Sequence, residues 1–228
     1  MTSPRETIER IADQLEGFGS SFGLREEALP EGMARREGAW NGRPVALCTR
    51  VFGDAAGRVF RIARVEGEAM SSLTLVGVAG EVVLGVDLVR FEDRFATFIA
   101  DVSGLDEAAS ASTHALAEVT RPLRAEGSSG PPPDAPFGPG VLWARPAAAQ
   151  APEVEAAVLA HAAVFRDHAQ EAPLSPERAR KVAAYLAWLA ASKKQMKALS
   201  ALFGSDWVPR YFDEVFLAMP RTARAVGA

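Results

Sequence analysis

Five short apolar runs follow one another in the middle of the chain, and this succession constrains the fold more than any other feature. Turn-like clusters separate the runs, which cover 45–52, 58–66, 72–78, 82–90 and 95–102. Connections this short join antiparallel neighbours, because a parallel pair needs a crossover of a dozen or more residues. The pattern therefore predicts an antiparallel meander, and Gly140 to Pro146 (GVLWARP) reads as one more strand.

Helical patterns occupy both ends of the sequence. The helical segments are 5–17, 106–121, 153–170, 175–202 and a last stretch that begins at Asp206. Helices before and after a central sheet favour an α+β fold, a three-layer α/β/α sandwich with a central antiparallel β-sheet. We expect residues 1–228 to form a single domain, in which the Pro/Gly-rich segment 126–140 is a long surface loop or a linker.

One carboxylate stands on an apolar strand face. Side chains alternate along a strand, so Asp87 shares its face with Val83, Gly85 and Val89. A carboxylate in such a place costs free energy unless something pairs with it, and desolvation raises its pKa. A raised pKa suits a proton donor that works near neutral pH. The alternative is an aspartate that caps a turn or pairs with a neighbouring arginine, and both interpretations stay open.

The charge balance is acidic overall but uneven. A formal net charge of −4 argues against non-specific nucleic-acid binding. Residues 177–228 contain nine Lys or Arg and four Asp or Glu, so this stretch carries +5 and the remainder −9. A basic C-terminal face could receive an acidic protein or an anionic ligand, or could be an ordinary solvated helix surface.

Several classes of protein are disfavoured by what the sequence contains. A single cysteine, Cys48, forms no internal disulfide and is too few for a zinc or iron–sulfur site. No apolar run approaches the roughly 18–20 residues of a membrane span, and the amphipathic N-terminus does not read as a signal peptide. We therefore expect a cytoplasmic monomer that does not bind a membrane.

Motifs for common cofactors and nucleophiles are missing from the sequence. There is no Walker loop, nucleophile elbow or HExxH motif, and Gly77, Gly80 and Gly85 have no helix after them as a dinucleotide site requires. His161 and His168 lie seven apart on one predicted helix and could be metal ligands. No cysteine or carboxylate cluster accompanies them, so no metal site is expected.

Four blocks of sequence resemble a known family. The string LGVDLVRFEDRFATFIADVSG resembles the central sheet of the ferredoxin-dependent bilin reductases, in particular the phycocyanobilin-forming members. Its two ends, Gly85 to Val89 and Ala100 to Ser103, match the family's Gly-x-Asp-Leu-Val strand and its strand that ends in Asp near Ser. The WARP of Trp143 to Pro146 and the terminal KALSALFGSDWVPRYFDEVF resemble later blocks in the same order.

The resemblance implies a substrate, an electron donor and a proton donor. Such enzymes bind biliverdin or a related bilin between the sheet and the C-terminal helices, with no bound metal or flavin cofactor. Electrons arrive singly from reduced ferredoxin, and the family's central proton donor falls on Asp87. Arg145 would suit the propionates of the pigment, and the basic C-terminal region would suit an acidic ferredoxin.

The resemblance also has departures at expected substrate-binding positions. Arg61 stands where phycocyanobilin-forming enzymes have a glutamate, Thr74 or Leu75 stands at a histidine position, and Ser192-Lys193 replaces an Asn-Asp pair. A divergent reductase that performs a two-electron step with Asp87 is the first hypothesis. A non-catalytic bilin-binding protein of the same fold is the alternative, and an assembly or regulatory protein of tetrapyrrole metabolism is a third.

Overall fold

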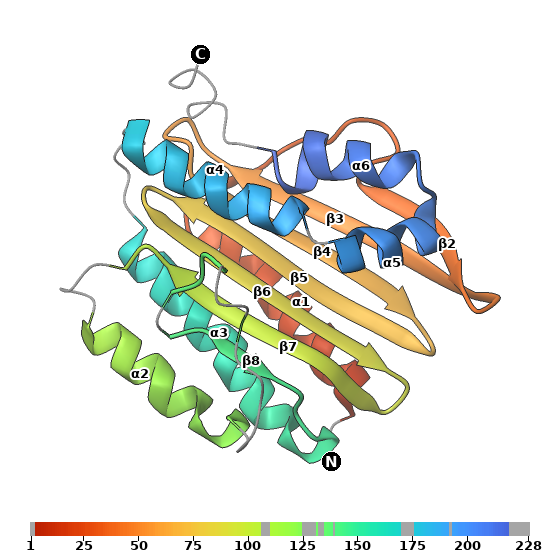
Figure 1. The fold of residues 1–228 in the computed structure, drawn as a ribbon, viewed down its shortest axis with the longest axis horizontal. Coiled ribbons are helices and arrows are strands. Elements are labelled where there is room, and N and C mark those ends of the chain that lie inside the picture. The colour runs from red at the N-terminus through yellow and green to blue at the C-terminus, as the bar shows by residue number, and fades with distance from the viewer. Residues whose placement is uncertain are drawn as a thin grey trace.

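The computed structural model has a broad twisted sheet with helices on both sides (Figure 1). It describes residues 3–105, 110–124, 131, 135–138, 140–169, 176–191 and 193–218. The strands are β1 (Arg25–Glu26), β2 (Arg35–Trp40), β3 (Arg43–Gly53), β4 (Val59–Gly67), β5 (Met70–Ala79), β6 (Val82–Phe91), β7 (Arg94–Ser103) and β8 (Leu142–Ala144). The helices are α1 (Pro4–Ser21), α2 (Ser110–Thr120), α3 (Ala151–His168), α4 (Pro176–Ala190), α5 (Lys193–Phe203) and α6 (Trp207–Tyr211).

Antiparallel pairing runs through the whole sheet. The strand order is β1-β3-β4-β5-β6-β7-β8, and β2 also pairs with β3. The five strands of the predicted meander and the additional strand β8 are therefore confirmed. Strand β2 was not predicted, because its arginines and glutamate read as polar surface, and it is in fact an exposed edge strand.

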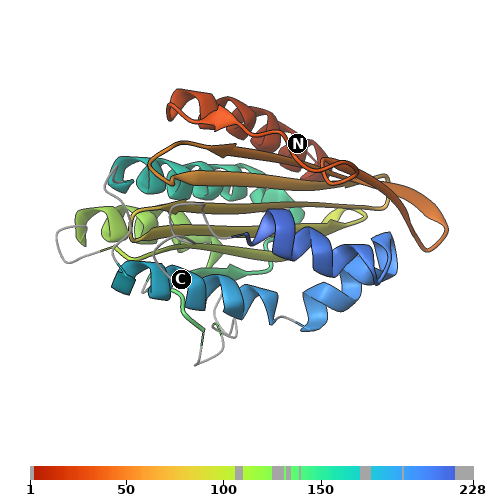
Figure 2. The ribbon, with the colours of Figure 1, turned by 90° about the horizontal axis from the view of Figure 1, so that it is seen from above.

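The two faces of the sheet are covered by different parts of the chain, which confirms the predicted sandwich. Helices α1, α2 and α3 lie on one side, and α4, α5 and α6 lie on the other (Figure 2). Ile8, Ile11 and Leu15 of α1 and Phe165 of α3 pack on the first face. Tyr185 of α4 packs on the second face, together with side chains of α5 and α6.

The predicted helix 175–202 is wrong as a single helix. Helix α4 ends at Ala190 and α5 begins at Lys193, because the two halves cover different strands. The end of α5 rests on β2, where a Cβ at Gly38 would collide with the carbonyl oxygen of Leu202. Gly204, with a φ of +103°, follows the last residue of α5 and ends the helix. Residue 175, where the predicted helix begins, lies outside the described residues.

A buried arginine fixes one end of the sheet from the α1 side. Arg90 is 2% exposed, and its guanidinium donates hydrogen bonds to the hydroxyl of Ser71 and to the carbonyl groups of Gly67, Glu68 and Glu92. Burial lowers its pKa from the ordinary value. Since these carbonyls belong to the β4–β5 and β6–β7 turns, one side chain ties two hairpins together.

The two histidines that were considered as metal ligands have other partners. His161 is fully buried in α3, and its Nδ1 lies 2.7 Å from the carbonyl oxygen of Ala157. Nε2 of His168 lies 2.8 Å from the hydroxyl of Ser112 on α2. Burial lowers the pKa of His161 to about 4, so its imidazole is neutral in the folded protein near neutral pH.

The low pKa of His161 predicts an acid-sensitive fold. Between pH 6.5 and 4 the unfolded histidine binds a proton that the folded one does not, so the free energy of unfolding falls as pH decreases. The loss should reach about 3 kcal/mol below pH 4. Urea denaturation of wild type and His161→Gln at pH 7 and 4.5 measures it, because glutamine keeps a donor for Ala157 but does not titrate. An equal loss in both proteins would contradict this assignment.

Candidate functional site

The two faces of β5–β8 differ in how completely helices cover them. On the α1–α3 face the alternating residues are buried along all four strands. On the α4–α6 face a group of neighbouring positions is partly exposed. We call this group the open strip, and its residues are Ser72, Thr74, Gly85, Asp87, Val89, Phe91, Thr97, Ile99 and Trp143. In Figure 1, α4 crosses the upper left ends of the strands, whereas no helix lies in front of the lower right parts of β6 and β7.

Strand register places Asp87 in the middle of this strip. Asp87 on β6 lies opposite Thr74 on β5 and Ile99 on β7, and Ile99 lies opposite Trp143 on β8. These side chains point to the same face because cross-strand partners share a face. The open strip is therefore a continuous surface across four strands, with a carboxyl group near its centre.

The surroundings of Asp87 make it a weak acid that titrates near neutral pH. Its Oδ1 accepts a hydrogen bond of 3.1 Å from the hydroxyl of Thr74. Desolvation raises the pKa of Asp87 to about 6, and the hydrogen bond from Thr74 opposes part of that rise. The residue keeps some accessible surface on the strip, but the protein atoms packed around its carboxyl group make burial the larger influence. Among the described residues its partner is a threonine, so the alternative of an arginine pair is wrong.

Aromatic side chains lie at two ends of the open strip. Trp40 of β2 stacks on Phe91 with ring centroids 5.3 Å apart, beside the β6–β7 turn. At the other end, Phe137 makes edge contacts with Trp143 at 6.1 Å and with Trp188 of α4 at 5.0 Å. A flat, extended ligand could lie along the strip and meet aromatic surface at either end.

A second carboxyl group lies next to the strip under α4. Asp101 on β7 is fully buried, and it accepts hydrogen bonds from the hydroxyl of Ser103 and from the backbone N–H of Gly138, at 3.0 Å to Oδ1. Burial raises the pKa of Asp101, and these two hydrogen bonds oppose the rise. Its cross-strand partner on β6 is Gly85, two residues before Asp87.

The structure brings together some of the predicted site residues. Thr74 contacts Asp87 directly, and Arg145 follows β8 as an exposed residue. Arg61 lies elsewhere on the same face: its side chain is 2% exposed, and its guanidinium donates a hydrogen bond to the carbonyl of Ala218. Ser192 and the side chain of Lys193 lie outside what the structure describes.

The sequence did not predict the aromatic residues at the ends of the open strip or the complete burial of Asp101. Tyr185, Trp188 and Phe137 come close to the sheet only through tertiary packing, which periodicity does not reveal. One signal was available, because a glycine inside a strand often marks a close approach. A Cβ at Gly85 would indeed collide with the hydroxyl oxygen of Tyr185.

Comparison with known proteins identifies the fold and the family of this chain. Among solved structures, phytochromobilin synthase from tomato in complex with biliverdin matches with a TM-score of 0.67 and 11% identity, over 95% of this chain and 85% of that chain. At this identity the likeness shows the fold. The sequence model of the ferredoxin-dependent bilin reductases matches residues 11–217. No curated protein sequence matches significantly. The chain therefore belongs to the ferredoxin-dependent bilin reductase family.

The described residues contain neither a candidate membrane-spanning helix nor a candidate metal-binding cluster. None of the helices in this part of the chain has the length and apolar character that a membrane span needs. No group of three or more His, Cys, Asp or Glu side chains among the described residues is placed to hold a metal ion.

The hydrogen bond from Thr74 predicts a measurable effect on Asp87. Thr74→Val removes the donor that favours the carboxylate, so the pKa of Asp87 should rise above about 6, by about one unit. Carbon-13 NMR titration of the aspartate carboxyl groups measures this pKa. Ser72→Ala is the matched control, because it removes a hydroxyl from the same face of β5 and should leave Asp87 unchanged. An unmoved pKa in Thr74→Val would show that the threonine does not hold the carboxylate.

Proposed function

We propose that this protein reduces biliverdin or a related linear tetrapyrrole, with electrons from reduced ferredoxin and a proton from Asp87. The observation that carries the proposal is a single one: a carboxyl group with a pKa of about 6 faces an open strip of the sheet. Such a group is protonated often enough near neutral pH to act as a general acid. Membership of the family supplies the electron donor and the class of substrate.

The role of Asp87 follows from the order of the reaction. Ferredoxin gives one electron at a time, so each electron adds negative charge to the pigment, and a nearby acid can neutralise this charge. A protonated Asp87 can give its proton to the pigment, and the resulting carboxylate is stabilised by Thr74 and by any positive charge on the pigment. Thr74 does not release its hydroxyl proton near neutral pH, so Asp87 is the only group of this contact that can act as an acid. This supports a two-electron rather than a four-electron reduction.

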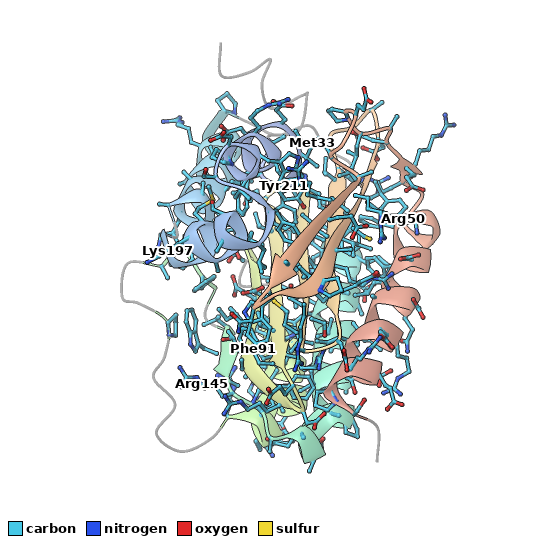
Figure 3. All side chains as sticks on the ribbon, turned by 90° about the vertical axis from the view of Figure 1, so that its right-hand side faces the viewer. Met33, Arg50, Phe91, Arg145, Lys197 and Tyr211 are labelled. Carbon is cyan, nitrogen blue, oxygen red and sulfur yellow. The ribbon has the colours of Figure 1, made fainter. Side chains whose placement is uncertain are left out.

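Basic residues on the same side of the protein would serve the anionic partners. Arg145 and Lys197 both project from the side of the sheet that carries the C-terminal helices (Figure 3). Arg145 follows directly after β8, the strand whose Trp143 belongs to the open strip. Its guanidinium could therefore pair with a propionate of the pigment. Lys197 is exposed on α5 and would contribute to the docking of an acidic ferredoxin.

A bilin-binding protein without redox chemistry is the second candidate. The observation that favours it is the hydroxyl of Thr74, which pairs with Asp87 and does not release a proton near neutral pH. Both candidates bind the pigment, but only the reductase changes it. Absorbance of the biliverdin mixture, followed without oxygen after addition of reduced ferredoxin, separates them: a progressive spectral change supports the reductase, and a shifted but constant spectrum supports the binding protein.

Asp87→Asn tests the proton donor. The amide is nearly the same size, so the fold and the affinity for biliverdin should change little, while turnover falls at least about a hundredfold. Asp93→Asn, in the exposed turn after the same strand, is the matched control and should keep wild-type turnover. Undiminished turnover in Asp87→Asn would remove Asp87 from the mechanism.

The pKa of Asp87 also predicts the pH dependence. The donor works in its protonated form, so the turnover rate should be highest below about pH 6 and should fall about tenfold per pH unit above that value. A rate profile measured between pH 5 and 9 with saturating biliverdin tests this direction. A rate that rises with pH would require a base instead of an acid at this position.

Charge reversal on α5 tests ferredoxin docking. Lys197→Glu should raise the KM for ferredoxin about two- to fivefold, and the increase should shrink at high salt. Arg166→Glu makes the same change of net charge on α3, which covers the opposite face of the sheet, and serves as the control. If both variants raise KM equally, the effect comes from net charge and not from a docking surface on α5.

A further inference from the structure

A buried tyrosine of α4 has a polar atom that the proposed mechanism does not use. Tyr185 is 3% exposed, and its hydroxyl has no hydrogen-bond partner among the described residues. The ring is held by an edge contact with Phe137 at 6.1 Å. An unmade hydrogen bond at a buried hydroxyl costs free energy, so a residue whose only task is packing would do better as phenylalanine.

The tyrosine hydroxyl lies over Gly85, on the sheet face that carries both Asp87 and Asp101. It occupies the place that a Cβ of residue 85 would take, and Gly85 faces the same side as Asp87. Gly85 is also the cross-strand partner of Asp101. Asp87 and Asp101 are therefore diagonal neighbours on one face, a relation in which residues lie about 7–8 Å apart and their Cβ atoms somewhat closer. A hydroxyl over Gly85 is therefore near the path that a proton would take from one of these side chains to the other.

We propose that Asp101 and Tyr185 form a second proton supply that recharges Asp87 during turnover, with the Tyr185 hydroxyl as the link between the two carboxyl groups. The inference rests on the proposed function, because it assigns where the second proton of the same reaction comes from. Asp101 and Tyr185 act through Asp87 and do not touch the pigment. On the strands of the sheet, Asp101 is the only other acidic side chain on the α4–α6 face.

The proton balance of the reaction requires such a supply. Reduction of one double bond of the pigment consumes two electrons, one from each of two reduced ferredoxins, and two protons. Asp87 gives the first proton and becomes a carboxylate. The carboxylic acid of Asp101 then gives its proton through one water molecule to the oxygen of Tyr185, while the hydroxyl proton of Tyr185 passes through a second water molecule to Asp87. Tyr185 ends unchanged, and Asp87 can give the second proton.

The surroundings of Asp101 suit both of its protonation states. Burial favours the carboxylic acid before transfer. The hydroxyl of Ser103 and the N–H of Gly138 stabilise the carboxylate after transfer. Phe137 and Gly138 are partly exposed, so water can return a proton to Asp101 along this segment. Conversion of Tyr185 itself to a phenolate is disfavoured, because burial and the charge of Asp101 raise the pKa of its hydroxyl.

Few other groups can influence the titration of Asp101. From the sheet, Asp87 is the nearest titratable group on the same face, and the segment 136–138 offers only backbone groups and Phe137. From α4, Tyr185 is the titratable group whose described side chain faces the sheet, and Arg180 is exposed and donates to the carbonyl of Pro176. Among the described residues, no charged group other than these lies against Asp101.

Tyr185→Phe and Asp101→Asn test the proton supply through kinetics. Both variants should bind biliverdin with a KM within about twofold of wild type, while kcat falls at least about tenfold. The kcat–pH profile should lose the contribution of the second acid, and the solvent deuterium isotope effect should change. Tyr211→Phe is the control, because it removes another buried hydroxyl of the same layer, 2.7 Å from Thr49 on β3. Wild-type kcat and pH profile in Tyr185→Phe would overturn the proposal.

A titration without pigment separates this proposal from the proposed function. Carbon-13 NMR of the ligand-free protein reports the pKa of Asp87, which should shift upward in Tyr185→Phe because the water-mediated link to the Tyr185 hydroxyl is lost, and should stay in place in Tyr211→Phe. An unshifted pKa overturns the link even in a protein that reduces nothing. If wild type fails to reduce biliverdin but the pKa shifts, the proposed substrate or donor fails while the link between the carboxyl groups is supported.

Discussion

The sheet has two apolar faces, and helices cover only one of them completely on the strands that carry the site. On the α1–α3 face every alternating residue of β5–β8 is buried, whereas the α4–α6 face keeps an open strip. This difference creates the environment of Asp87. Full coverage would leave the carboxyl group without access to a ligand, and no coverage would leave its pKa near that of an aspartate in water. The partial exposure of Asp87 therefore depends on where helices α4 and α5 end.

Much of this arrangement could be predicted from the residues themselves. Alternation and short turns predict the antiparallel meander, and the apolar neighbours of Asp87 predict a raised pKa. The break between α4 and α5 could not be predicted, because the helical pattern runs through it and the reason lies in which strands each half covers. The same holds for Tyr185, whose place over Gly85 depends on the packing of a helix about a hundred residues away. Arg61 shows the limit of alignment: its position was inferred from the family, but its side chain is bound to Ala218.

The contact of Thr74 with Asp87 limits what this pair of side chains can do. A hydroxyl can orient a carboxyl group, but it cannot store a proton near neutral pH. The chain keeps one acid on the strip and has another acid, Asp101, under α4, where the tyrosine hydroxyl lies over Gly85. Family membership and local chemistry therefore answer different questions here. The family identifies the pigment class and the electron donor, and in the proposed mechanism the side chains around Asp87 supply the protons.

Arg90 has a consequence for the way a ligand would be received. Its four hydrogen bonds hold two turns together behind the strip, so the backbone beneath Phe91 and Val89 is already ordered before any ligand arrives. A surface that is rigid beforehand loses little conformational entropy on binding. It also adapts poorly to a ligand of different curvature. Selectivity among pigments would then come from the shape that a flexible tetrapyrrole must adopt to lie on a fixed twisted sheet, because the strain falls on the pigment and not on the protein.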